Sequence, residues 1–149
     1  MALSMFGEFF HNVDAKGRLS IPAKFRDSLG STIVIATDPD KCLRIYSVEE
    51  WDKFMNNLRE QVDTSSVEGR NLMRFFAANA SMCDLDSQGR IIVSQNLRKY
   101  AGIIKEVVVI GNGERAEVWD KQKYEATFAD ITEDGDAITD LIAKYGLQV

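Results

Sequence analysis

The chain contains Asp14-Ala15-Lys16-Gly17-Arg18-Leu19-Ser20-Ile21-Pro22-Ala23-Lys24-Phe25-Arg26 and, 72 residues later, Asp86-Ser87-Gln88-Gly89-Arg90-Ile91-Ile92-Val93-Ser94-Gln95-Asn96-Leu97-Arg98. An Asp, a Gly, an Arg and a second Arg occupy the same four places in both copies. Gly30 then matches Gly102, and further apolar pairs match after one inserted residue. Such ordered self-similarity indicates a duplicated unit of roughly 45 residues with a bridging segment between the copies.

Each copy predicts the same order of elements: an extended segment, a tight turn, a short strand, a short helix and a hairpin. Asp favours local backbone hydrogen bonds and Gly allows positive φ, which together favour the turn. In the first copy we expect the extended segment at 9–13, the turn at 14–17, the strand at 19–21 and the hairpin at 33–46. The helix should have Pro22 at its first position and end at Gly30. In the second copy Ser94 should cap the helix, Gly102 should end it, and 107–110 and 116–119 should flank a tight turn at 111–114.

Amphipathic helices are expected after each copy. Ser47-Val48-Glu49-Glu50 and Ser65-Ser66-Val67-Glu68 have the pattern of capping boxes. Apolar residues recur at helical spacing after each box and near the C-terminus, which predicts core or subunit contacts. The three stripes are Val48, Trp51, Met55, Leu58 and Val62; Leu72, Phe75 and Phe76; and Ile138, Leu141, Ile142 and Tyr145.

One copy is too small to close a hydrophobic core by itself, but two copies folded around each other would do so. The expected fold class is therefore α+β: a β-rich unit with pseudo-twofold symmetry, packed outer helices, and two turns projecting in related directions. The expected division is a first repeat over 5–56, a bridging helical segment over 57–80, a second repeat over 81–128 and an acidic helical tail over 129–149.

Composition limits the class of protein. The 149 residues are 45% hydrophobic and 28% charged, an ordinary globular balance. No apolar run reaches the ~18 residues that would span a bilayer, so no membrane partner is expected. The start lacks the basic and apolar regions of a signal peptide, and two widely spaced cysteines read as reduced thiols in a cytoplasm.

Charge is uneven along the chain. The net charge of −5 alone argues against a nucleic-acid binder. Two short windows are basic, however: residues 11–26 carry four basic side chains against one acid, and residues 86–99 carry three against one. An acidic body with local positive faces can still meet phosphate.

Enzymatic chemistry is poorly supported. A single histidine, His11, cannot build a histidine-based metal cluster, and no hydrolase, metalloprotease or phosphate-binding loop motif occurs. Gly111-x-Gly113 lacks a third glycine and an opening helix, so it fits a hairpin rather than a dinucleotide site. We therefore expect no catalytic residue, no metal, no cofactor and no small-molecule ligand.

The repeated Asp-x-x-Gly-Arg admits two interpretations. In the structural one, Asp closes the turn, Gly supplies the dihedral and Arg pairs back to Asp. In the functional one, Asp and Gly shape the loop while Arg, suited to bidentate recognition of phosphate or guanine edges, meets DNA. Duplication beside two basic windows favours the second.

The residues quoted above resemble the bacterial MraZ family. The resemblance rests on Phe6-Gly7-Glu8, the run from Asp14 to Arg26, the paired Asp-x-x-x-Arg motifs, Trp51 and the bridging run from Arg70 to Ala80. It covers residues 5–128. It implies an AbrB-like swapped-hairpin fold, and a transcription regulator of the division and cell-wall gene cluster that binds direct repeats in its own promoter as a closed homo-oligomeric ring.

The same resemblance maps the DNA-contacting motif onto Asp14 and Arg18, and onto Asp86 and Arg90. Together with the basic windows it yields a candidate site on double-stranded DNA, in a cytoplasmic, nucleoid-associated protein. The expected DNA-binding residues are Asp14, Lys16, Gly17, Arg18, Lys24, Arg26, Asp86, Gly89, Arg90 and Arg98. The second window is weaker because Ser87-Gln88 replaces Ala15-Lys16.

Three alternatives stay open. The repeated turns could bind an acidic protein partner in a non-enzymatic scaffold. A small hydrolase could use Asp86, Cys83 or His11, if a pocket brought a nucleophile and a base together. An antitoxin-like module of the same fold would use its acidic tail to bind a toxin.

Overall fold

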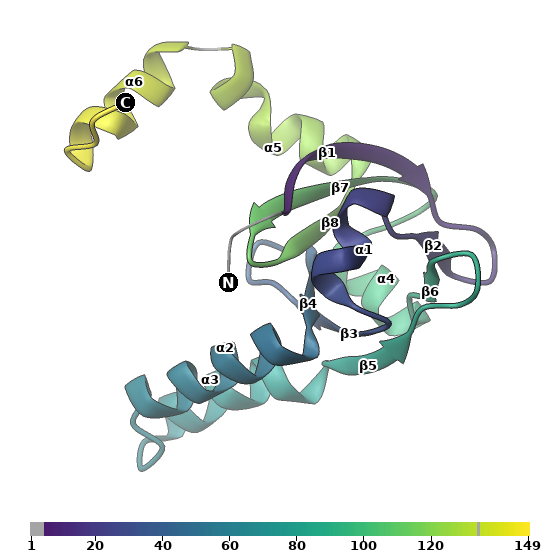
Figure 1. Ribbon diagram of the computed structural model, residues 1–149. Coiled ribbons are helices and arrows are strands. Elements are labelled where there is room, and N and C mark those ends of the chain that lie inside the picture. Colours follow the sequence, from purple (N-terminus) through teal and green to yellow (C-terminus); the bar gives the residue numbers. More distant parts are fainter. Residues whose placement is uncertain (1–4, 134) are drawn as a thin grey trace.

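The computed structural model describes residues 5–133 and 135–149, arranged as two β-sheets and six helices (Figure 1). The larger sheet has six strands in the order β1-β7-β8-β4-β3-β5, and β2 and β6 form a separate two-stranded ribbon. The strands are β1 (Met5–Asn12), β2 (Arg18–Ser20), β3 (Thr32–Thr37), β4 (Leu43–Ser47), β5 (Ser81–Asp84), β6 (Arg90–Ile92), β7 (Glu106–Gly113) and β8 (Ala116–Asp120). The α+β duplication predicted from the sequence is confirmed.

The two repeats exchange their first strands. β1 of the first repeat pairs antiparallel with β7 of the second, from Met5↔Gly113 to Asn12↔Glu106. β5, its counterpart in the second repeat, pairs with β3 of the first. The ribbon also takes one strand from each repeat. Neither repeat therefore has a complete set of backbone partners of its own.

The hydrophobic core lies between the larger sheet, the ribbon and two short helices, α1 (Ala23–Leu29) and α4 (Gln95–Ala101). Equivalent residues of the two repeats enter it in pairs: Leu19 and Ile91 from the ribbon are 0% and 1% exposed. Phe9 meets Phe25 edge to face at 5.2 Å between ring centroids. Burial of this kind stabilises by about 1.5–3 kcal/mol for each large apolar side chain.

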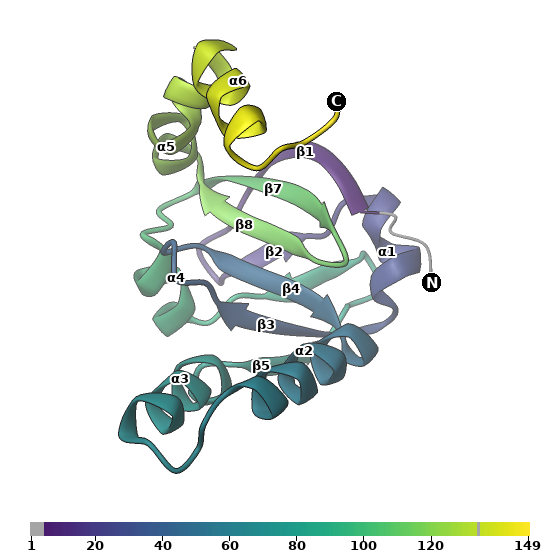
Figure 2. The same ribbon diagram turned by 90° about the vertical axis from the view of Figure 1, so that its left-hand side faces the viewer.

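Two helix pairs flank the outer face of the larger sheet (Figure 2). α2 (Val48–Gln61) and α3 (Val67–Ala78) lie beside β3, and α5 (Lys121–Glu133) continues from β8 towards α6 (Gly135–Lys144). Phe54 of α2 and Phe76 of α3 meet edge to face at 5.0 Å between centroids. None of the helices within the described residues is long and apolar enough to cross a membrane.

Most expected boundaries are confirmed, including the caps at Ser47 and Ser94, whose hydroxyls accept hydrogen bonds from Glu50 N and Leu97 N. Pro22 is the N-cap of α1, one position before the helix begins. The second capping box also shifts by one residue: Ser66 caps α3 by accepting from Gly69 N at 3.0 Å. Ser65 instead bonds Asp63 through both its amide and its hydroxyl.

The expected turn at 111–114 is wrong at its start, because β7 continues to Gly113. The reason is the exchanged strand: β1 pairs as far as Gly113 and approaches Gly111 closely. A Cβ atom on Gly111 would lie 2.5 Å from Met5 O, so only glycine accommodates the approach. The chain reverses later, with Asn112 N donating to Arg115 O.

Candidate nucleic-acid interface

The first loop is closed by the carboxylate of Asp14. Its Oδ1 accepts from the backbone N–H groups of Lys16 and Arg18, both at 2.9 Å, and its Oδ2 accepts from Arg18 Nε at 2.6 Å. Gly17, at φ 85°, turns the chain so that its N–H donates to Asp14 O. The loop therefore holds the arginine by one edge of its guanidinium.

The second loop repeats this construction. Asp86 Oδ1 accepts from Gln88 N at 2.8 Å and Arg90 N at 2.9 Å, while Oδ2 accepts from Arg90 Nε at 2.9 Å. Gly89 has φ 75°. The structural interpretation of the motif, in which Arg pairs back to Asp, is the arrangement found in both copies.

Both carboxyls are held in their charged form. Hydrogen bonds to a carboxylate favour ionisation, and the backbone N–H of Arg18 is the largest cause that lowers the pKa of Asp14. The backbone N–H of Arg90 does the same for the pKa of Asp86. Each aspartate therefore stays an anion that fixes its arginine, well below neutral pH.

The two loops are joined through the ribbon. Arg18 lies opposite Ile92, Leu19 opposite Ile91, and Ser20 opposite Arg90. Since alternate residues of a strand face opposite sides, burial of Leu19 and Ile91 places the other four side chains together on the outer face. The side chains of Arg18 and Arg90 are 37% and 29% exposed.

Each loop is backed by an arginine from the other repeat, which the sequence did not indicate. Arg26 donates from Nε to Ile21 O, and Arg98 donates from Nε to Val93 O. A Cβ atom on Gly89 would overlap the Arg26 guanidinium, and one on Gly17 would lie 3.3 Å from Arg98 Nη2. Arg26 thus lies with the second loop and Arg98 with the first.

The remaining predicted lysines are both exposed. Lys16 lies at the tip of the first loop, and Lys24 lies in the first turn of α1. Sequence reasoning missed two residues on the outer face of the ribbon, Ser20 and Ile92. The alternation of buried Leu19 and Ile91 with their neighbours was the signal that could have found them.

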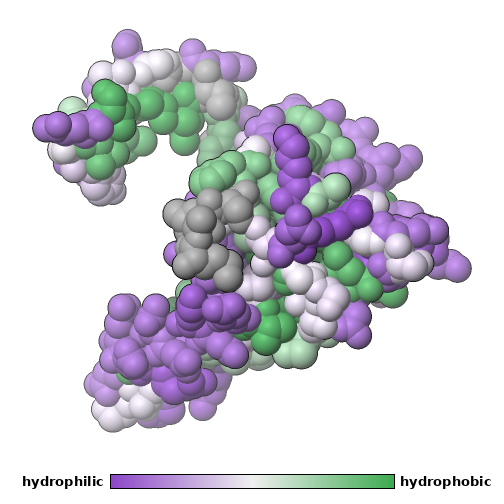
Figure 3. Space-filling view, in the orientation of Figure 1, coloured by the Kyte–Doolittle hydropathy of each residue, from purple (hydrophilic) through white to green (hydrophobic). Residues whose placement is uncertain are grey.

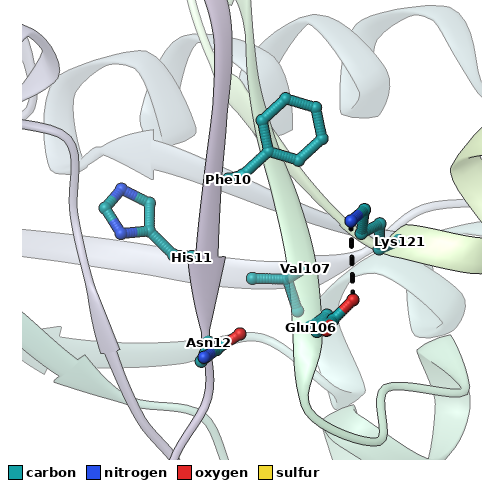
Figure 4. Close-up of a pocket in the computed structure, with 6 residues that line it drawn as sticks. All are labelled: Phe10, His11, Asn12, Glu106, Val107 and Lys121. Carbon is teal, nitrogen blue, oxygen red and sulfur yellow. Dashed lines mark ion pairs between the residues drawn. The ribbon is translucent and has the colours of Figure 1, made fainter.

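A pocket of about 230 Å³ contains the only histidine, but it does not assemble a hydrolase (Figure 4). His11 points away from the ion pair between Glu106 Oε2 and Lys121 Nζ, which are 3.6 Å apart. The pocket is lined by Phe10, His11, Asn12, Glu106, Val107 and Lys121, so neither Cys83 nor Asp86 reaches it.

A second polar cluster contains Asp38, Cys42 and Glu117, whose potential metal-ligand atoms lie within 4.8 Å of one another. Asp38 Oδ2 accepts from Arg44 Nε at 2.6 Å, and Glu117 Oε1 accepts from Trp119 Nε1 at 2.9 Å. Burial, together with the nearby carboxylates, raises the pKa of the Cys42 thiol. We assign no metal to this cluster because both carboxylates already accept hydrogen bonds from neighbouring side chains.

Comparison with known proteins agrees with this geometry. The family model described as "MraZ protein, putative antitoxin-like" matches residues 5–75 and 76–140. The chain is 43% identical over 142 residues to the transcriptional regulator MraZ of Acetivibrio thermocellus, covering 95% of this chain and 99% of that protein. It is 40% identical over 141 residues to the protein of that name from Lachnoclostridium phytofermentans, covering 95% and 96%.

A further relative from Alkaliphilus oremlandii, also named transcriptional regulator MraZ, is 43% identical over 141 residues, covering 95% and 98%. These names describe regulators and give no enzymatic activity. The two segments matched by the family model meet between residues 75 and 76, shortly before β5 opens the second repeat. The family match and the similarity to these regulators over nearly the whole length agree with the duplicated loops and the exchanged strands. The chain therefore belongs to the MraZ family of transcription regulators.

Proposed function

We propose that this protein regulates transcription by binding double-stranded DNA through the outer face of the β2/β6 ribbon. The observation that carries the proposal is the pair of Asp-held arginines, Arg18 and Arg90, which are partly exposed on the same face of one two-stranded ribbon. The major groove of B-DNA admits such a ribbon, and arginine can pair with both acceptors of a guanine edge. Each Nε–H is occupied by its aspartate, which leaves the terminal amino groups for DNA.

The two loop tips supply a local positive surface on an acidic protein. Lys16 extends from the first tip, and Arg26 and Arg98 bring further positive charge behind the loops. The counterpart of Lys16 is Gln88, so the second tip carries less charge. Asp14, Gly17, Asp86 and Gly89 shape the loops, and Lys24 adds a phosphate contact at the edge of the surface.

A closed homo-oligomeric ring on direct repeats in the protein's own promoter completes the proposal, with the division and cell-wall gene cluster as its target. One protomer makes few phosphate contacts, and linked copies facing repeated sites gain ~10²-fold or more in affinity. The C-terminal segment, from the start of α6 at Gly135 to Val149, offers apolar residues for subunit contact (Figure 3). Ile138 is 37% exposed, Leu141 42% and Tyr145 68%. Ring closure requires heterologous contacts of this kind.

The test is a mobility-shift assay on the DNA upstream of the protein's own gene, with competitor DNA lacking the repeats. Arg18→Ala and Arg90→Ala should each weaken binding by roughly 5- to 160-fold, because an arginine that pairs with a base contributes about 1–3 kcal/mol. Arg59→Ala is the matched control, since Arg59 lies on α2 and bonds Asn56. Normal binding by Arg18→Ala, or association with acidic proteins but not with promoter DNA, would contradict the proposal.

Salt dependence supplies a second measurement on the same complex. The logarithm of the affinity should fall linearly with the logarithm of salt concentration, by about 0.9 for each phosphate neutralised. Lys16→Ala should lower this slope by about one for each bound protomer. The same slope for Lys16→Ala and for the wild type would exclude phosphate contact by the loop tip.

A further inference from the structure

We infer that Ile92 reads a thymine methyl group in the major groove, and that the two repeats thereby read unlike bases. The inference rests on the proposed function and specifies its sequence preference. Ile92 is 64% exposed, although it lies in a strand whose neighbour Ile91 is 1% exposed. It stands directly opposite Arg18, on the face that carries both loop arginines.

The position of Ile92 places an apolar group between two cations. Arg18 is its direct cross-strand neighbour, and Arg90 precedes it by two residues on the same face of β6. Directly opposite side chains in a ribbon have Cβ atoms about 4.5–5.5 Å apart. An arginine on a guanine edge would therefore bring the isoleucine side chain to an adjacent base.

The chemistry of the groove suggests what this group meets. Thymine alone among the four bases presents a methyl group in the major groove, and apolar side chains contact it. An isoleucine can make no hydrogen bond to a base edge or to phosphate. In the proposed complex, burial of its exposed surface is thus favourable only against an apolar feature of DNA.

The first repeat carries a different group at the same place. Ser20 is the counterpart of Ile92 at the offset of 72 residues, and it lies opposite Arg90. A hydroxyl both donates and accepts hydrogen bonds, so it suits a polar base edge. The ribbon is therefore pseudo-symmetric in backbone but not in its readout, and each protomer should read an asymmetric sequence in one orientation. Such a reader fits direct repeats rather than palindromes.

The test replaces thymine by deoxyuridine in the upstream DNA, which removes the methyl group and keeps base pairing. For the wild-type protein the dissociation constant should rise by ~4-fold for each thymine methyl group that contacts an Ile92 side chain and is removed. This factor corresponds to the burial of one apolar carbon. Ile92→Ser should bind thymine and deoxyuridine DNA equally well. Ser20→Ile should add a second thymine preference, at another position of the repeat.

Two controls keep the outcome interpretable. Ile104→Ser removes an 85% exposed isoleucine outside the ribbon and should keep the full thymine preference. Ile92→Val keeps an apolar side chain and should retain most of that preference, and circular dichroism should show that each variant folds. Wild-type protein that binds both DNAs equally, while Arg18→Ala still binds more weakly than the wild type, overturns this inference and leaves the proposed function standing. Failure of the wild type on both DNAs overturns the proposed function itself.

Discussion

Arg98, from the second repeat, lies against Gly17 in the loop of the first repeat. A Cβ atom on Gly17 would stand 3.3 Å from Arg98 Nη2 and 2.5 Å from Val93 O. Val93 N in turn donates to Gly17 O at 2.7 Å, so the loop is bonded to the second repeat through its backbone. The shape of each arginine-bearing loop consequently depends on residues of both repeats.

Replacing Gly17 by alanine should destabilise the protein by more than about 2 kcal/mol. The left-handed backbone costs a residue with a Cβ about 1–2 kcal/mol, and the overlap with the Val93 carbonyl adds to that cost. Gly102→Ala is the matched control, because Gly102 has φ 67° and no atom within 4 Å of its Cβ position. Urea unfolding should show a clearly larger loss of stability for Gly17→Ala, and equal losses would mean that the loop moves freely away from Val93.

The Asp14 carboxyl should titrate below the ordinary aspartate value of 3.8. Because its pKa is lower in the folded than in the unfolded state, its contribution to stability is full above 3.8 and is lost as pH falls through the folded pKa. Carboxyl carbon shifts in an NMR titration would measure this. Arg18→Ala should raise the pKa only partly, since the backbone N–H of residue 18 remains as a donor. A return to 3.8 would show that the Arg18 side chain, and not this backbone N–H, lowers the pKa of Asp14.

The two cysteines should differ in reactivity towards a thiol reagent at about pH 8. The thiolate is the reactive form, so a cysteine with a raised pKa reacts slowly at this pH. Cys42 is fully buried, and desolvation raises its pKa far above the ordinary value of 9.0. Cys83 is half-buried, and its pKa is raised by desolvation and by Asp84. We expect slow labelling of Cys83 and labelling of Cys42 only on unfolding. The Cys83→Ser variant isolates Cys42, and rapid labelling of that folded variant would show the thiol to be accessible.

Charge placed on the apolar stripe of α6 should disrupt self-association. Leu141→Asp puts a carboxylate among Ile138, Ile142 and Tyr145, where subunit contact would bury it at a cost of several kcal/mol. Ala143→Asp adds the same charge on the opposite side of the helix and should leave assembly intact. Light scattering should show smaller particles for Leu141→Asp alone. Unchanged mass in both variants would remove α6 from the proposed ring contact.

The duplication made much of the fold predictable. Because both copies carry Asp, Gly and Arg at matching places, the two loops, the short helices and the flanking hairpins followed from local rules of turns and caps. The pairing of Asp14 with Arg18 was also foreseeable, since the two residues are four apart across a tight turn. These features depend on neighbours in the sequence.

Long-range partners could not be predicted in this way. Strand pattern shows which face of a strand is buried but not which strand it pairs with, so nothing local joined β1 to β7. Because local pattern does not identify these partners, it did not predict that β7 continues to Gly113, inside the expected turn. It also did not predict that Arg26 lies against the second loop and Arg98 against the first. Ser65 and Ser66 were equally good caps by type, and only the bonds of Asp63 separate them.

The exchange of first strands sets an order of events for the growing chain on the ribosome. β1 starts at Met5, yet the last residue of its partner is Gly113, so most of the polypeptide must be made before the N-terminal strand finds its place. Until then the backbone N–H and C=O groups of β1 have no strand partner and can pair with other nascent chains. Synthesis of the second repeat is therefore the step that completes the first.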